Sequence, residues 1–153
     1  MCKNAITKPV IYAICGYKNS GKTTLITKLI PLLNERGYKV ATIKHDGHDF
    51  VGDVPDTDSY KHKKAGAYGT AVFSNYRFQI VKETQGITEL DLMRFFPEAD
   101  IILLEGMKNS KYPKYVCDYP NIIPDELAVL EDILSQSKSK TSDIISDSVP
   151  SAL

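Results

Sequence analysis

The chain has 153 residues, of which 42% are hydrophobic and 25% charged, and its 19 basic side chains equal its 19 acidic ones. This balance favours one globular domain with its own core and disfavours a nucleic-acid binder or an anionic-membrane binder, because both usually carry a basic excess. No stretch is long and apolar enough for a membrane span, and the three cysteines lack the spacing of a disulfide framework or a zinc site, so we expect a cytoplasmic protein.

The first three elements predict a β-α-β unit. Residues 9–15 form a continuous apolar run, which is typical of a strand buried on both faces of a parallel sheet. Residues 22–36 follow with apolar side chains at helical spacing, and Gly37 fits a C-terminal stop. Pro31 lies inside this helix and should kink it or remove a hydrogen bond. Residues 39–43 predict the second strand.

Between the first strand and the helix, GYKNSGKT matches G-x-x-x-x-G-K-[ST] without a gap. Glycines let successive backbone N–H groups point inward, and the helix N-terminus adds its positive dipole, so the turn predicts a phosphate site. Lys22 would reach the β- and γ-phosphates, and the hydroxyl of Thr23 would bind Mg²⁺. A turn that only caps a helix is the alternative. The predicted loop contains Gly16, Tyr17, Lys18, Asn19, Ser20, Gly21, Lys22, Thr23 and Thr24.

Residues 44–59 are polar and form a longer segment than is needed only to connect two elements. Lys44, His45 and His48 directly follow the second strand, in the run KHDGHD. Spacing alone leaves three interpretations open: a transition-metal site, polar groups that face a phosphate, or a solvated loop. Asp46 is a candidate for the outer shell of the magnesium ion.

The rest of this segment is acidic and rich in side-chain oxygens, which suits a mobile switch over the nucleotide; Asp58 and Ser59 belong to it. A short helix is predicted over 58–65. Residues 67–74 and 77–83 predict two strands in an antiparallel pair. Because exposed strand edges readily pair with a second copy, this pair is the predicted dimer element.

Residues 87–96 predict an amphipathic helix that Pro97 ends, and residues 100–104 predict another buried strand. In parallel sheets ligands bind beyond the carboxyl ends of the strands. Glu105 is at that end, so we assign it to the metal or its water shell. Asp100 is at the opposite end and is interpreted as a strand-start residue.

The last part of the chain carries weaker signals. Residues 115–117 predict a short strand, and residues 124–136 predict a final helix. The serine-rich stretch after it should be mobile. We therefore expect one nucleotide-binding domain over 1–136 and a flexible tail over 137–153. The fold class is α/β: a three-layer P-loop NTPase-like fold, with a mainly parallel sheet and an antiparallel strand pair.

Six separated motifs make the sequence more specific than a phosphate loop alone. GYKNSGKTTL, KHDGH, D-x-P-x-x-D-S, AGA, LLEGMK and YPK occur in that order over roughly residues 10–116. In this order they resemble the molybdopterin-guanine dinucleotide biosynthesis protein B family. The resemblance implies a GTP-binding P-loop protein, typically dimeric, that assists the guanylyltransferase which attaches GMP to the molybdopterin cofactor.

The resemblance also implies roles for individual positions. Gly16 to Thr24 would form the phosphate loop, and Lys44, His45 and His48 the signature after the second strand. Asp58 and Ser59 would lie in the switch-like loop, and Glu105, Gly106 and Lys108 in the second acidic motif. The predicted catalytic pair is Lys22 and Glu105, and the predicted metal-binding set is Thr23, Asp46 and Glu105.

The chain also departs from the family pattern. Asp56 stands where the family usually has glycine, and Tyr17 replaces the lysine that related dimeric ATPases place after the first glycine. The part after YPK is shortened, and no N/T-K-x-D guanine signature is present. The preference for guanine therefore comes from the resemblance and not from these residues.

Three functions follow from these observations. The first is a GTP- and Mg²⁺-binding accessory protein with slow hydrolysis, because no catalytic base or arginine finger stands out. The second is an ATP-dependent small-molecule kinase or ligase of related fold. The third is a metal-delivery GTPase that uses His45 and His48. The expected partners are the guanylyltransferase, the pterin cofactor and a second copy of the chain, with neither nucleic acid nor membrane.

Overall fold

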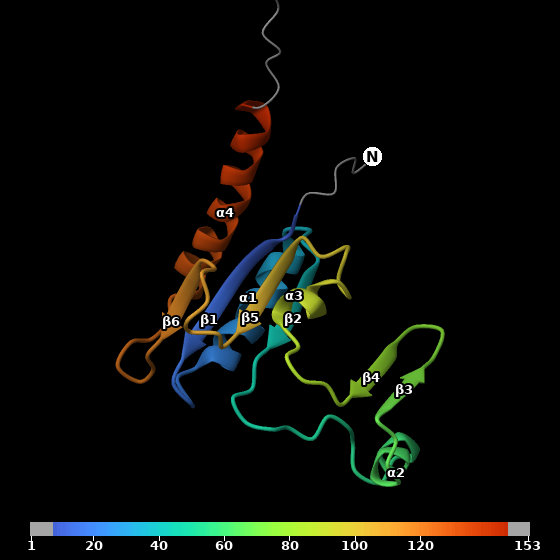
Figure 1. Ribbon diagram of the computed structural model, residues 1–153. Helices are drawn as coiled ribbons and strands as arrows, with labels where there is room; N and C mark the ends of the chain where they lie inside the picture. The colour runs from blue at the N-terminus through green and yellow to red at the C-terminus, as the bar shows by residue number, and fades with distance from the viewer. Residues whose placement is uncertain (1–7, 147–153) are drawn as a thin grey trace, which may run out of the picture. The chain divides into compact units, whose positions relative to one another are not determined.

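The computed structural model describes residues 8–146, with side chains through residue 137. These residues form two compact units, which are described separately. The core unit comprises residues up to His45 and residues from Leu92 onward, and the inserted unit comprises Asp46–Asp91. Figure 1 shows the core unit with its sheet and the inserted unit with its strand pair.

A four-stranded sheet is the base of the core unit, and all its neighbouring strands pair in parallel. The strand order is β2-β5-β1-β6, so β1 lies inside the sheet, between β5 and β6. Because the strands run in one direction, their carboxyl ends meet at one edge, as the sequence predicts. The strands are β1 (Val10–Gly16), β2 (Val40–Lys44), β5 (Ile101–Glu105) and β6 (Lys114–Cys117).

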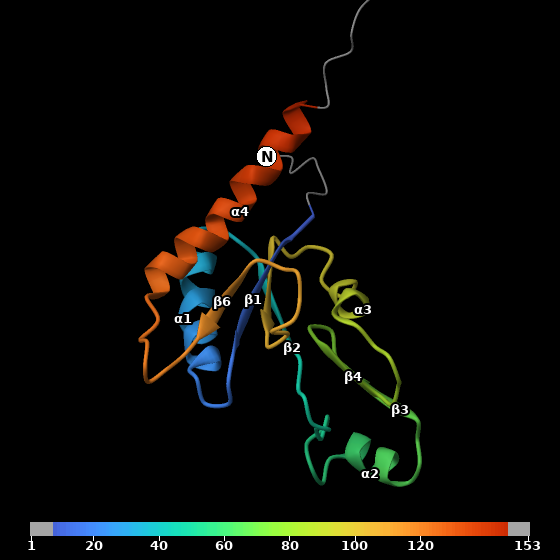
Figure 2. The same ribbon diagram turned by 60° about the vertical axis from the view of Figure 1, so that its left-hand side comes forward.

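Helices α1 (Lys22–Glu35) and α4 (Glu126–Ser146) lie on one side of this sheet. Figure 2 shows both on the same side of β1 and β6. Their apolar positions are spaced three and four residues apart, so each helix turns one stripe toward the strands. The buried residues that the two helices contribute to this core are Leu25, Ile26, Leu29, Leu33, Val129, Leu130 and Ile133.

The opposite face of the sheet has a smaller core. Its buried residues are Ala13, Ile43, Ile102 and Leu104. Helix α3 (Glu89–Met93) contributes Leu92 and Met93 to the cover of this face. With helices on both faces, the parallel sheet is enclosed, which explains its continuous apolar strands.

Two helices differ clearly in extent from the sequence prediction. Helix α4 runs to Ser146 instead of ending at residue 136, so it includes part of the predicted flexible tail. The rest of that tail, residues 147–153, is outside the described residues. Helix α3 is shorter than the predicted 87–96. Within residues 8–146, no helix combines the length and the apolar run needed to cross a membrane.

The inserted unit contains α2 (Asp58–Lys64) and an antiparallel pair of strands, β3 (Gly69–Phe73) and β4 (Phe78–Lys82). The predicted pairing is confirmed, and the Ser74 N–H group closes the turn with the Arg77 carbonyl at 2.8 Å. Residues opposite each other share a face of the pair. Phe73 lies opposite Phe78, and Ala71 lies opposite Ile80; all four side chains are exposed.

Candidate functional site

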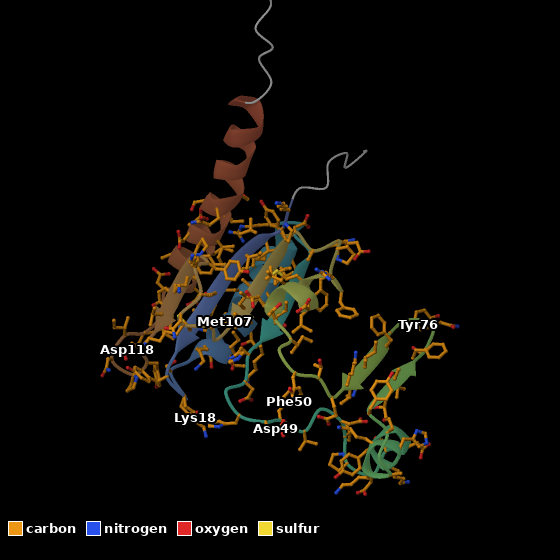
Figure 3. The ribbon with its side chains drawn as sticks, viewed as in Figure 1. Lys18, Asp49, Phe50, Tyr76, Met107 and Asp118 are labelled. Atoms are coloured by element: carbon orange, nitrogen blue, oxygen red, sulfur yellow. The ribbon has the colours of Figure 1, made fainter. Side chains whose placement is uncertain are left out.

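The loop between β1 and α1 curls where the sequence places its glycines. Gly16 and Gly21 have φ angles of 142° and 88°, and Asn19 also has a positive φ, 62°. A Cβ at position 16 would lie 2.4 Å from the Cys117 carbonyl oxygen, so a larger residue would collide with β6. Backbone of this kind turns N–H groups toward one point, where an anion can bind. Figure 3 labels Lys18 in this loop.

Lys22 is the first residue of α1, and its ammonium group folds back onto the loop. The Nζ atom donates to the Gly16 carbonyl at 3.1 Å and also to the Tyr17 carbonyl. The positive charge is therefore held against the first two residues of the loop that would receive phosphates. Thr24, the last residue predicted in the loop, is exposed on the first turn of α1.

Ser20 supports a ligand at this loop. Its side chain is 3% exposed, and its Oγ atom has no hydrogen-bond partner in the described structure. An unsatisfied buried hydroxyl costs about 1–3 kcal/mol, so such groups are uncommon unless a ligand or water completes them. A phosphate oxygen is an acceptor of the type that would complete this hydroxyl.

Thr23 and Glu105, both predicted as magnesium ligands, are in direct contact. The Thr23 Oγ1 atom donates to Glu105 Oε1 at 3.0 Å, although the two residues are 82 positions apart. Lys44 Nζ lies 3.8 Å from the same oxygen, and the Glu105 side chain is only 13% exposed. A hydroxyl and a carboxylate at this spacing are hard oxygen ligands of the type that Mg²⁺ prefers.

The segment after β5 also closes onto the loop region. Gly106 has a φ of 98° and donates its N–H group to the Ile14 carbonyl at 2.9 Å. The ammonium of Lys108 lies 5.1 Å from the centre of the Tyr17 ring, which is a cation–π contact. Gly106 and Lys108 thus lie beside the phosphate loop, and their role in nucleotide binding stays a prediction. The N–H group of His45 donates to the Glu105 carbonyl at 3.0 Å.

Asp100 is at the opposite edge of the sheet, where its Oδ2 atom accepts the Lys39 N–H group at 2.7 Å. Its interpretation as a strand-start residue is confirmed. Cys15 and Cys117 are free and buried. Burial is the main reason why the pKa of the Cys117 thiol is raised, so this cysteine remains protonated and inert.

Four of the predicted site residues belong to the inserted unit, and each makes local contacts there. Asp46 Oδ1 accepts the His48 N–H group at 3.1 Å. Asp58 begins α2 and pairs with Lys61 at 3.8 Å, and the buried Ser59 lies 3.3 Å from the Thr57 hydroxyl. Their roles beside a nucleotide stay predictions.

The KHDGHD run was one possible transition-metal site. Among the residues that the structure describes, no three His, Cys, Asp or Glu side chains group closely enough to hold a metal ion. His45 belongs to the core unit and His48 to the inserted unit. The Lys44 side chain lies beside Glu105, whereas His45 contacts Glu105 only through its backbone, so roles for the two histidines beside a phosphate stay predictions.

Sequence reasoning missed the loop that follows β6. The Tyr119 N–H group donates to the Ser20 carbonyl at 3.4 Å. A Cβ at position 21 would be 3.6 Å from the Tyr119 Cβ atom, so this tyrosine borders the phosphate loop. Its neighbour Asp118 accepts a hydrogen bond from Asn121 at 3.2 Å. The one signal in the sequence was position: these residues follow a strand of the parallel sheet, at its carboxyl end.

Two curated proteins that this chain resembles share one name. A curated protein of Escherichia coli (strain K12), named molybdopterin-guanine dinucleotide biosynthesis adapter protein, is 39% identical over 126 residues, which cover 78% of this chain and 72% of that protein. A protein of the same name from Haemophilus influenzae is 38% identical over 107 residues, with 68% of this chain and 60% of that protein covered. The chain therefore spans less than two thirds of the second relative.

Solved structures agree with the fold. The crystal structure of Bacillus subtilis MobB is 33% identical, with a TM-score of 0.57, and the match covers 71% of this chain and 68% of that one. The P-loop-like α/β fold is thereby confirmed. Residues 11–135 match the family model of MobB, molybdopterin guanine dinucleotide synthesis protein B. Since that match covers most of its length, the chain belongs to the MobB family.

Proposed function

We propose that this protein binds GTP with Mg²⁺ and acts as an adapter in the synthesis of molybdopterin guanine dinucleotide. It would work in the cytoplasm beside the guanylyltransferase that attaches GMP to the molybdopterin cofactor. The relatives from E. coli and H. influenzae are named as adapter proteins of this biosynthesis. Preference for GTP over ATP is part of the proposal.

One observation carries the proposal: Thr23 and Glu105 are hydrogen-bonded at 3.0 Å beside the loop that holds Lys22. The hydroxyl and the carboxylate come from α1 and β5, and only the parallel fold brings them together. A glycine-rich turn that merely caps a helix would not need an acid from another strand. This arrangement supports a site for a polyphosphate and its metal ion.

Each residue then has a physical role. Backbone N–H groups of the loop and the Ser20 hydroxyl would donate to phosphate oxygens, and Lys22 would exchange its two carbonyl partners for them. Thr23 and Glu105 would hold Mg²⁺ directly or through its water shell. The ion supplies charge neutralisation for the phosphate tail. The ammonium group of Lys44, 3.8 Å from Glu105 Oε1, partly compensates the negative charge of that carboxylate.

The chain offers little for fast hydrolysis. Its three arginines are Arg36, Arg77 and Arg94. Arg36 follows the C-terminal end of α1, where it donates to the Leu32 carbonyl at 2.9 Å, and Arg77 belongs to the inserted unit. Without an arginine finger, P-loop proteins hydrolyse their nucleotide slowly. Slow GTP hydrolysis suits an adapter whose nucleotide state matters more than its turnover.

A homodimer is also proposed, formed through the strand pair of the inserted unit. The face that carries Phe73, Phe78 and Ile80 is strongly exposed, at 84%, 64% and 54%. Covering such a surface with a second copy would remove a large apolar area from water, and an exposed strand edge can pair with its symmetry mate.

Calorimetric titration with GTP and with ATP, each with Mg²⁺, tests the nucleotide site. Lys22→Ala removes a charge-assisted contact worth about 1.5–3 kcal/mol, so GTP affinity should fall about tenfold or more. Lys28→Ala is the matched control, because Lys28 is further along α1 and pairs with Glu126. Absence of GTP binding to the unaltered protein would contradict the proposal. Tighter binding of ATP would favour the kinase or ligase alternative.

A further inference from the structure

The phosphate loop has two different neighbours in the sheet. On one side β5 brings Glu105 to Thr23, which is the metal-binding side of the proposed site. On the other side β6 pairs with the end of β1, with Cys117 opposite Gly16. A bound nucleotide whose terminal phosphates lie toward Glu105 must extend its nucleoside away from it. The loop after β6 is then the protein surface that the nucleoside meets.

This loop is fastened to the phosphate loop. The Tyr119 N–H group donates to the Ser20 carbonyl at 3.4 Å, and its Cβ atom lies against Gly21. The Tyr119 side chain is 53% exposed, so one part of the ring is free to meet a ligand. Figure 3 labels Asp118 in this loop and Lys18 in the neighbouring phosphate loop, at the same edge of the core unit.

Asp118 is held in a closed turn. The Ile122 N–H group donates to the Asp118 carbonyl at 3.0 Å, and Asn121 Nδ2 donates to Asp118 Oδ1 at 3.2 Å. The second carboxylate oxygen, Oδ2, has no hydrogen-bond partner among residues 8–146. The turn therefore fixes one oxygen of the carboxylate and leaves the other available.

An ionised carboxylate only accepts hydrogen bonds. The edge of guanine presents two donors, the N1–H group and the 2-amino group, whereas the same edge of adenine presents the acceptor N1. A carboxylate beside this edge would bind guanine and disfavour adenine, and an aromatic ring beside it would stack on either purine.

We propose that residues 118–122 form the purine site of this protein, in which Asp118 selects guanine and Tyr119 supports the base. This inference rests on the proposed GTP function and deepens it. It also explains how the chain can prefer guanine without an N/T-K-x-D motif, since the same acceptor chemistry comes from the turn after β6.

The test compares ligands that share the phosphates and differ in the base. Calorimetry would measure affinities for GTP, ATP, xanthosine triphosphate and inorganic tripolyphosphate, all with Mg²⁺. Xanthine carries a carbonyl where guanine carries its 2-amino group. Asp118→Asn introduces a donor that matches this carbonyl, so GTP affinity should fall about tenfold while xanthosine triphosphate binding strengthens. Glu131→Gln, on the exposed side of α4, is the matched carboxylate control.

Tyr119→Ala should weaken GTP and ATP binding alike, by about fivefold or more, because stacking does not distinguish the purines. Both substitutions should leave the affinity for tripolyphosphate unchanged. If tripolyphosphate binds and neither substitution alters nucleotide affinity or base preference, the purine site is wrong and the phosphate site stands. If the unaltered protein binds neither tripolyphosphate nor GTP, the proposed function itself is overturned.

Discussion

Thr23 on the first turn of α1 and Glu105 at the end of β5 share a hydrogen bond of 3.0 Å. This contact joins the phosphate-loop motif to the acidic motif at the end of β5, although 82 positions separate the two residues. It places a hydroxyl and a carboxylate ready for the same ion, while Lys44 lies 3.8 Å from the carboxylate. The core unit alone therefore positions the two proposed metal ligands.

Glu105→Gln should weaken GTP binding in the presence of Mg²⁺ by about tenfold. The amide keeps an oxygen that can accept from Thr23 but loses the charge that attracts the ion. Calorimetry with Mg²⁺ and with EDTA checks this, because binding in EDTA should not weaken. Asp100→Asn, at the opposite edge of the sheet, serves as control. Equal losses with and without Mg²⁺ would contradict a metal role for Glu105.

Tyr12 links β1 to α4 through a hydrogen bond from its hydroxyl to Asp132. Burial, followed by this hydrogen bond and the nearby carboxylate charge, raises the pKa of Tyr12 well above its ordinary value of 10.0. The unfolded chain then loses the proton at lower pH than the folded protein. Stability due to Tyr12 is therefore complete below about pH 10 and declines as the pH rises above that value.

Tyr12→Phe should lower the free energy of unfolding at pH 7 by about 1 kcal/mol, because one hydrogen bond is lost. Above pH 10 the stability of the variant should also fall less steeply with pH than that of the unaltered protein. A single tyrosine can contribute at most about 1.4 kcal/mol per pH unit to this slope. Urea unfolding between pH 7 and pH 11 measures both effects. Tyr76→Phe is the control, since Tyr76 is 91% exposed. Parallel pH profiles for Tyr12→Phe and the unaltered protein would refute this explanation.

Asp56 has a φ of 68°, the left-handed conformation that favours glycine. It stands where the family pattern usually has glycine, so this chain places an acidic residue in a backbone conformation that glycine adopts without strain. Asp56→Gly should leave the turn before α2 intact, whereas Asp56→Ala should destabilise it by about 1 kcal/mol. Hydrogen exchange of the Lys61 amide, which donates to the Thr57 carbonyl, reports this difference. Similar exchange in both variants would show that the position carries no strain.

The exposed face of the strand pair gives the fourth prediction. Ile80→Glu puts a charge on the proposed dimer surface, so sedimentation at micromolar concentration should change from dimer to monomer. Thr84→Glu adds the same charge outside β4, in an exposed position, and should leave the dimer intact. An unaltered protein that sediments only as monomer would rule out this surface as a dimer interface at that concentration.

Local patterns predicted most elements of the core unit. The phosphate loop, the flanking strand and helix, and the opposite positions of Asp100 and Glu105 all follow from spacing and from the direction of parallel strands. Spacing also predicted the strand pair of the inserted unit. These signals were readable because each lies within a few neighbouring residues.

Features that depend on distant contacts were missed. Helix α4 continues to Ser146 although its sequence after residue 136 is polar and serine-rich. Its first turns are anchored by Val129, Leu130 and Ile133, and an existing helix extends at one hydrogen bond per added residue. Helix α3 ends at Met93, and the N–H groups of Phe95 and Phe96 then bond to the carbonyls three residues back, which is a tighter turn than an α-helix. The turn at Asp118 matches no sequence motif. Only the contact of the neighbouring Tyr119 with Ser20 shows that this turn lies beside the phosphate loop.

The two carbonyl bonds of Lys22 have a consequence for how tightly any anion can be held. The ammonium group donates to the backbone carbonyls of Gly16 and Tyr17. A phosphate that binds to Lys22 would replace these two hydrogen bonds. The net free energy of binding is then the difference between the hydrogen bonds that form and those that are lost. Substituting Lys22 would thus also loosen the loop itself. Hydrogen exchange of the backbone amides between Gly16 and Gly21 should therefore be faster in the variant, measured without added nucleotide.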